Sequence, residues 1–69
     1  MADTPKQFVL YKDNAGEFRW RLFATNGKVI ADSGEGYKNR VDCVAGARSV
    51  ASTASNAGIW DGDNQRWID

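Results

Sequence analysis

The sequence predicts one small α+β domain: a three-stranded antiparallel meander, one helix packed on one sheet face, and a short C-terminal strand. Three observations support this fold class. Strand-forming residues fill the segments 7–12, 17–25 and 28–33. Turn-forming residues separate these segments. The segment 39–54 then repeats small and apolar residues at helical spacing.

The second hairpin is predicted from the dipeptide Asn26-Gly27. Both residues tolerate the positive φ angles of a two-residue type I′ turn. A loop of this length pairs Arg21 with Asp32, which carry opposite charges. A cross-strand charge pair contributes roughly 0.2–1 kcal/mol.

The first hairpin is predicted to have a four-residue loop at 13–16, which pairs Lys12 with Glu17. One bulged residue would shift this register and exchange the two faces of a strand.

Side chains alternate between the two faces of the predicted sheet. The residues expected on the core face are Val9, Tyr11, Phe18, Trp20, Leu22, Ala24, Val29 and Ala31. Those expected on the opposite face, here named the outer face, are Phe8, Leu10, Arg19, Arg21, Phe23, Ile30 and Asp32.

The helix is predicted from Asn39, a good N-terminal cap, to about Ala54. Its buried stripe is narrow and made mostly of small residues, namely Cys43, Gly46, Ala47, Val50 and Ala54. Gly46 costs roughly 1 kcal/mol of helix propensity relative to alanine. We therefore expect Gly46 at the closest approach of the helix to the sheet.

The chain is predicted to have three parts. A flexible arm spans 1–6, the β-β-β-α-β domain spans 7–61, and a C-terminal extension spans 62–69. The final strand of the domain contains Ile59 and Trp60.

Size and composition limit how this domain is stabilised. A 69-residue chain is near the lower limit for folding alone, and a core of this size rarely supplies more than about 3–5 kcal/mol. The single cysteine, Cys43, has no partner for an internal disulfide, and the sequence has no histidine for a metal site. A second subunit is the remaining means of stabilisation, so we expect the chain to oligomerise.

Charge and hydropathy indicate the compartment and exclude some partners. Nine basic and nine acidic residues cancel, which argues against binding nucleic acid or lipid through bulk charge. The apolar runs are far shorter than the ~20 residues of a membrane span, and 1–7 does not resemble a signal peptide. With one free thiol, we expect a cytoplasmic protein without membrane contact.

Several motifs together resemble the YegP-like family of small bacterial and archaeal proteins, whose function is not established. The matching segments are 9–13, 16–22, 26–31, Ser33 with Gly36-Tyr37, Gly46, Val50 and Asp61. The resemblance implies a β-β-β-α-β unit that completes its sheet by exchanging C-terminal strands with a second unit. It therefore implies a homodimer whose exchanged strand contains Ile59 and Trp60. Ala47 and the extension 62–69 depart from the family pattern.

The sequence offers no catalytic, metal or cofactor site. Cys43 has no histidine to activate it and lies on the apolar stripe, where a thiol behaves as a small hydrophobe. The segment 61–65 resembles the start of a calcium loop, but Arg66 stands where that loop needs glycine. We expect a solvated turn there and a protein that is not an enzyme.

The outer face is the one candidate binding surface. Its candidate residues are Phe8, Leu10, Arg19, Arg21, Phe23 and Ile30. Three interpretations stay open. In the first, the C-terminal tail or a second subunit covers the face, and the arginines pair with Asp32 and Glu17. In the second, the face binds a protein or peptide. In the third, it binds single-stranded nucleic acid by stacking and phosphate contacts. The zero net charge weighs against the last interpretation.

Overall fold

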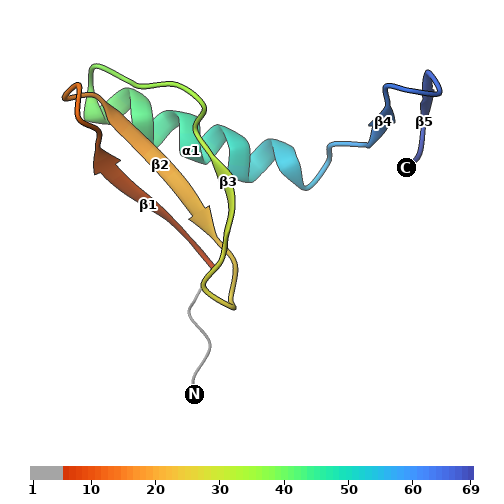
Figure 1. Ribbon diagram of the computed structural model, residues 1–69, viewed down its shortest axis with the longest axis horizontal. Coiled ribbons are helices and arrows are strands. Elements are labelled where there is room, and N and C mark those ends of the chain that lie inside the picture. Colours follow the sequence, from red (N-terminus) through yellow and green to blue (C-terminus); the bar gives the residue numbers. More distant parts are fainter. Residues whose placement is uncertain (1–5) are drawn as a thin grey trace.

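The computed structural model describes residues 6–69 and contains a three-stranded sheet, one helix and a separate C-terminal hairpin (Figure 1). The elements are β1 (Gln7–Lys12), β2 (Phe18–Phe23), β3 (Val29–Asp32), α1 (Arg40–Ala54), β4 (Trp60–Asp61) and β5 (Arg66–Trp67). The sheet is antiparallel with order β1-β2-β3, which confirms the predicted meander and helix. The arm predicted at 1–6 lies outside the described residues except for Lys6.

The first hairpin has a three-residue loop at 14–16, so the predicted four-residue loop is wrong by one residue. The Asp13 amide donates to the Glu17 carbonyl at 2.9 Å, and the Gly16 amide donates to the Asp13 carbonyl at 3.0 Å. Gly16 has φ 83°, a conformation that glycine adopts without steric cost. This is a type I turn closed by a glycine bulge.

This one-residue difference exchanges the faces of β1 relative to β2. Leu10 pairs with Trp20, and Tyr11 pairs with Arg19. Directly paired residues share a face. Phe8 and Leu10, predicted on the outer face, are therefore on the helix side and pack against the core. Val9 and Tyr11, predicted in the core, are on the outer face.

The second hairpin uses the same kind of turn instead of the predicted type I′ turn. The Ala24 amide donates to the Lys28 carbonyl and the Gly27 amide donates to the Ala24 carbonyl, both at 2.9 Å. Gly27 has φ 84°, whereas Asn26 does not have a positive φ. The loop thus has three residues where two were predicted.

An irregularity in β3 then restores the predicted register. Phe23 pairs with Val29, so the predicted pairing of Phe23 with Ile30 is wrong and Val29 lies on the outer face. Ile30 is the extra residue of a bulge, and it is 63% exposed. Beyond the bulge, Arg21 pairs with Asp32 as predicted.

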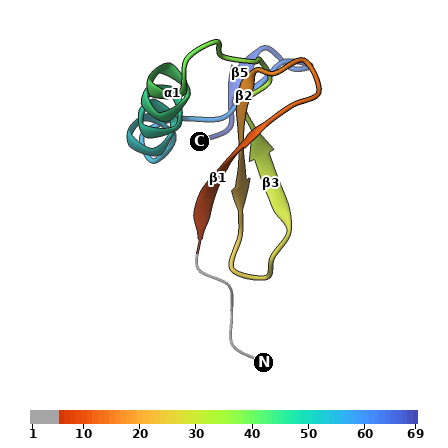
Figure 2. The same ribbon diagram turned by 90° about the vertical axis from the view of Figure 1, so that its left-hand side faces the viewer.

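The core lies between α1 and the β1–β2 part of the sheet (Figure 2). Its buried residues are Trp20, Cys43 and Ala47. The half-buried side chains packed around them are Phe8, Leu10, Phe18, Leu22, Ala31, Tyr37 and Val50. The rings of Phe8 and Trp20 meet edge to face, with centroids 5.0 Å apart. This core is small, as expected for a chain of this length.

The helix follows its prediction at the N-terminus and along most of its stripe. Asn39 occupies the cap position with extended backbone, but its side chain donates to Asp42 Oδ2 at 3.3 Å and makes no hydrogen bond to the helix backbone. Cys43 and Ala47 are buried, whereas Ala54 is exposed. In Figure 1 the C-terminal half of α1 continues past the sheet, so nothing in the described chain covers that end of the stripe.

Candidate functional site

The outer face of the sheet is the surface opposite α1, and the structure changes its membership. Arg19, Arg21 and Phe23 lie on it as predicted. Phe8 and Leu10 do not, because they pack in the core. The residues that this face gains are Val9, Tyr11 and Val29.

One arginine of the outer face is held by the first hairpin loop. Arg19 Nε donates to Asp13 Oδ2 at 2.6 Å. The other carboxylate oxygen, Asp13 Oδ1, accepts from the amides of Ala15 at 2.9 Å and Glu17 at 3.0 Å. These bonds, with Arg19 first, hold the pKa of Asp13 below its ordinary value. Asp13 therefore caps its own turn and orients Arg19; the predicted pairing of an arginine with Glu17 is wrong.

The second arginine stacks on an aromatic ring. The Arg21 guanidinium lies 4.3 Å from the centroid of the Tyr11 ring. Asp32 faces Arg21 across β2 and β3, but no ion pair joins them within the described residues. Asp32 Oδ1 instead accepts from the Gly34 amide at 2.9 Å. A cation–π contact at an exposed site contributes about 0.5–1 kcal/mol, and it leaves the guanidinium N–H groups of Arg21 free to bind.

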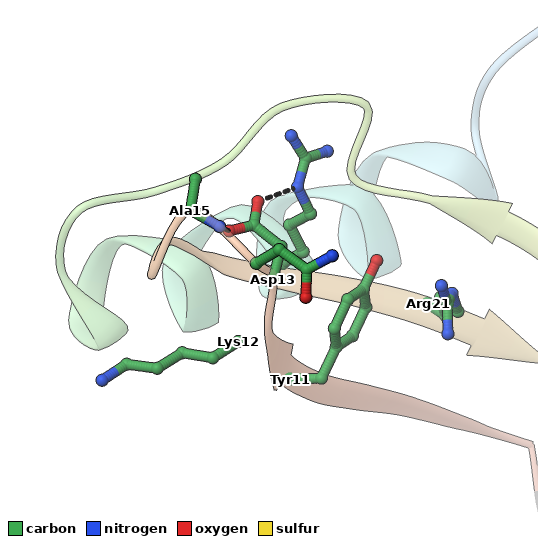
Figure 3. Close-up of a pocket in the computed structure, with 7 residues that line it drawn as sticks. Tyr11, Lys12, Asp13, Ala15 and Arg21 are labelled. Carbon is green, nitrogen blue, oxygen red and sulfur yellow. Dashed lines mark hydrogen bonds and ion pairs between the residues drawn. The ribbon is translucent and has the colours of Figure 1, made fainter.

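These side chains surround an open cavity of about 600 Å³ at the end of the sheet (Figure 3). The lining residues are Tyr11, Lys12, Asp13, Asn14, Ala15, Arg19 and Arg21. In Figure 3 Tyr11 and Arg21 lie side by side, and the dashed line marks the bond that Asp13 accepts. The Lys12 side chain points away from them, with its ammonium 5.2 Å from the centroid of the Phe18 ring. The cavity is therefore polar, with two guanidinium groups and a phenol beside the Asp13 carboxylate and the Asn14 amide.

Apart from Asp32 opposite Arg21 and Gln7 opposite Phe23, the rest of the outer face is apolar. Val9 is 38% exposed, Val29 is 49% exposed and Phe23 is half-buried. Ile30 at the bulge adjoins them. We call Tyr11, Arg19 and Arg21 the cationic half of the outer face, and Val9, Phe23, Val29 and Ile30 its apolar half.

Sequence reasoning missed Tyr11 as a member of this site. A signal for it exists, because Asp13 and Gly16 stand three residues apart, the spacing of a type I turn followed by a glycine bulge. Counting a three-residue loop places Tyr11 opposite Arg19.

The C-terminal segment forms a hairpin of its own, apart from the sheet (Figure 1). Trp60 pairs with Trp67, and their rings meet edge to face with centroids 5.3 Å apart. The predicted strand at Ile59 and Trp60 begins at Trp60, and Ile59 continues the ladder by accepting from the Ile68 amide at 2.7 Å. The extension 62–69 thus supplies the turn and the second strand. The hairpin does not cover the outer face.

The hairpin turn uses the residues that resembled a calcium loop. Asp61 Oδ1 accepts from the amides of Asp63 and Asn64, and Asp61 Oδ2 accepts from the Asn64 side chain at 2.8 Å. These bonds, with Asn64 first, lower the pKa of Asp61. The carboxylate is committed to the turn, which agrees with the predicted solvated turn.

Two observations on residues 6–69 concern groups that often take part in catalysis, a thiol and potential metal ligands. Cys43 is fully buried, and burial raises the pKa of its thiol. No cluster of three potential metal ligands occurs in the described residues. Within the same range, no helix has the length and apolar character needed to cross a membrane.

Comparison with known proteins places this geometry in a family. Residues 13–61 match the family model described as a domain of unknown function, DUF1508. A UPF0339 protein of Treponema denticola is 43% identical over 53 residues, covering 77% of this chain and 90% of the relative. A UPF0339 protein of Methanosarcina acetivorans is 45% identical over the same shares. The NMR solution structure of a protein from Haloferax volcanii superposes with a TM-score of 0.77 at 35% identity, covering 90% of this chain and all of that one.

Proposed function

This chain belongs to the DUF1508 family of small proteins of unknown function, and on that premise we propose that it is a non-enzymatic binding module that works as a homodimer by exchanging its C-terminal hairpin. The observation that carries the proposal is the position of the hairpin. It projects beyond the end of α1 (Figure 1). Its large apolar side chains are exposed.

The exposed area of the hairpin is large for so small a chain. Its exposed apolar residues are Ile59 at 55%, Trp60 at 48%, Trp67 at 67% and Ile68 at 63%. An isolated two-stranded hairpin is marginally stable in water. Burying one large apolar side chain fully contributes about 1.5–3 kcal/mol. Covering these four half-exposed side chains therefore contributes on the order of several kcal/mol, comparable to the whole core of such a domain.

A complementary surface lies on the same chain. The end of α1 carries an apolar groove of about 300 Å³, lined by Ser49, Val50, Thr53 and Ala54. The chain's own hairpin extends beyond the end of α1 (Figure 1). The apolar side chains of a second copy's hairpin match this apolar groove. In a twofold-symmetric exchange, each hairpin would occupy the groove of the other subunit.

The experiment that tests the exchange measures the mass of the protein in solution. At micromolar concentration, the full chain should have the mass of a dimer by light scattering. A chain truncated after Gly58 should be a monomer, because it lacks both strands of the hairpin. A monomeric full chain, or a truncated chain that stays dimeric, contradicts the exchange.

A second candidate function follows from the outer face. Arginines and aromatic rings lie side by side there, and such a surface stacks single-stranded bases and contacts phosphates. We keep weak single-stranded nucleic-acid binding through Arg19, Arg21 and Phe23 as the alternative. Titration with a single-stranded oligonucleotide at low salt tests it: unchanged NMR spectra would end this alternative.

The proposal places the module in the cytoplasm. Its one thiol, Cys43, is free and buried, which suits a reducing compartment. The same burial supports the non-enzymatic assignment, because the most nucleophilic side chain of the described residues is kept from substrates.

A further inference from the structure

We propose that the outer face binds a partner-protein segment that presents two carboxylates followed by an apolar side chain. The inference rests on the proposal that the chain is a binding module. It does not rest on hairpin exchange, because every residue involved belongs to the sheet of one subunit.

The cationic half has unused donors arranged around the cavity. Arg19 uses only Nε to bind Asp13, so its two terminal nitrogens have no partner in the described part of the chain. Arg21 is held by the Tyr11 ring and makes no ion pair with the described acidic residues. A guanidinium with its terminal N–H groups free is the group best suited to a carboxylate. Both arginines are oriented before any ligand arrives, which lowers the entropy lost on binding.

The spacing of the arginines selects an extended ligand. Arg19 and Arg21 are alternate residues of β2 and lie on the same face, so their Cα atoms are about 7 Å apart. Alternate residues of an extended peptide have the same separation. Two carboxylates at alternate positions therefore match the two guanidinium groups one to one.

The apolar half continues this match along the same strand. Phe23 is the next residue of β2 on the outer face, flanked by Val29 on β3. Val9, opposite Arg21, extends the apolar surface on β1. A ligand with its carboxylates on the arginines thus places its next alternate side chain over Phe23, where burial of an apolar group is favourable.

Charge on the same face favours this ligand over a nucleic acid. Asp13 borders the cavity and Asp32 lies opposite Arg21. A phosphodiester strand brings a charge at every nucleotide, whereas the peptide brings only the two charges that face Arg19 and Arg21. The chain also has zero net charge, so it lacks the long-range attraction that dominates nucleic-acid affinity.

The test is an NMR titration of the full chain with synthetic peptides. The probes are acetyl-Glu-Ser-Glu-Ser-Leu-amide and its reversed order, acetyl-Leu-Ser-Glu-Ser-Glu-amide. Both orders are needed, because a peptide that runs parallel or antiparallel to β2 matches the spacing of the outer-face side chains. One of them should cause saturable shifts at Tyr11, Arg19, Arg21 and Phe23. The shifts should vanish at about 1 M salt, where the Debye length is about 3 Å. The same peptide with glutamine in place of glutamate should cause none.

Variants separate the site from general charge effects. Arg21→Gln should weaken binding by about two- to fivefold, the effect of losing one exposed ion pair. Arg48→Gln removes the same charge from the exposed surface of α1 and should leave binding unchanged. Equal weakening by both variants would overturn the proposal.

Two further outcomes would also overturn it. The first is the absence of saturable shifts with both peptides. The second is an oligothymidine that shifts the same residues at lower concentration than the peptides, which would assign the face to nucleic acid. The mass of the same sample is measured in parallel. If the sample is a dimer and neither peptide binds, only this inference is contradicted. If the sample is a monomer and a peptide binds, only the hairpin exchange is contradicted.

Discussion

Tyr37 occupies the space that a side chain at Gly46 would need: Tyr37 Oη lies 2.5 Å from the position of a Cβ atom built on that glycine. Tyr37 is held in place by the backbone, since its amide and carbonyl each form a 2.8 Å hydrogen bond with Phe18. The glycine was predicted to mark a close approach to the sheet. The close approach exists, but it is made by a side chain that follows β3 and reaches the helix.

Gly46→Ala should destabilise the fold. Overpacking a core site costs typically 1–3 kcal/mol, and the gain in helix propensity offsets about 1 kcal/mol of this. We expect a net loss of up to about 2 kcal/mol in urea denaturation. In a Tyr37→Phe background the loss should be smaller, because the hydroxyl oxygen nearest to the new methyl group is gone. An equal loss in both backgrounds would contradict the role of Tyr37.

Gly16→Ala should destabilise the first hairpin. Gly16 has φ 83°, and a left-handed conformation costs an L-residue roughly 1–2 kcal/mol. The control is Gly62→Ala, because Gly62 does not have a positive φ and a Cβ there meets no atom within 4 Å. If both variants unfold at the same urea concentration, the glycine bulge does not set this register.

Asp13 should make the stability of the domain depend on acid pH. Its folded pKa is lowered, chiefly by Arg19, so its contribution is present above the unfolded pKa of about 3.9. It is lost as the pH falls through the lower folded pKa. Asp13→Asn should therefore be less stable than the wild type at neutral pH, and the difference should shrink below about pH 4. Asp63→Asn, at an exposed position in the β4–β5 turn, is the control; a pH-independent difference for Asp13→Asn would contradict the ion pair.

Cys43 should be inert toward thiol reagents in the native state. It is fully buried, and burial raises the pKa of its thiol, so little thiolate is present at neutral pH. Ellman's reagent should react at the rate of local or global opening. Reaction in urea provides the reference for the exposed thiol. Equal rates with and without urea would show that the thiol is not part of the core.

The strands, the helix and their order could be predicted because they follow from local patterns. Alternation and turn residues predict the meander, and the small-residue stripe predicts that Cys43 and Ala47 face the sheet. The Arg21–Asp32 register was also correct, although for an incomplete reason. A longer loop and a bulge at Ile30, both unpredicted, cancel each other.

The membership of the candidate site depended on one residue of loop length. A loop of three residues, not four, moves Tyr11 to the outer face and Phe8 and Leu10 into the core. Period-2 alternation cannot detect this shift, because β1 carries apolar residues on both faces. The pairing of Trp60 with Trp67 was equally inaccessible, since two-residue strands leave no periodicity to read.

Isotope-filtered NMR tests the exchange of hairpins most directly. Labelled and unlabelled chains are unfolded together, refolded and examined for contacts between different chains. The exchange predicts intermolecular NOEs from the rings of Trp60 and Trp67 to the Val50 methyl groups in the apolar groove of α1. A dimer in which Val50 has no NOE to either tryptophan of the other chain would contradict the exchange.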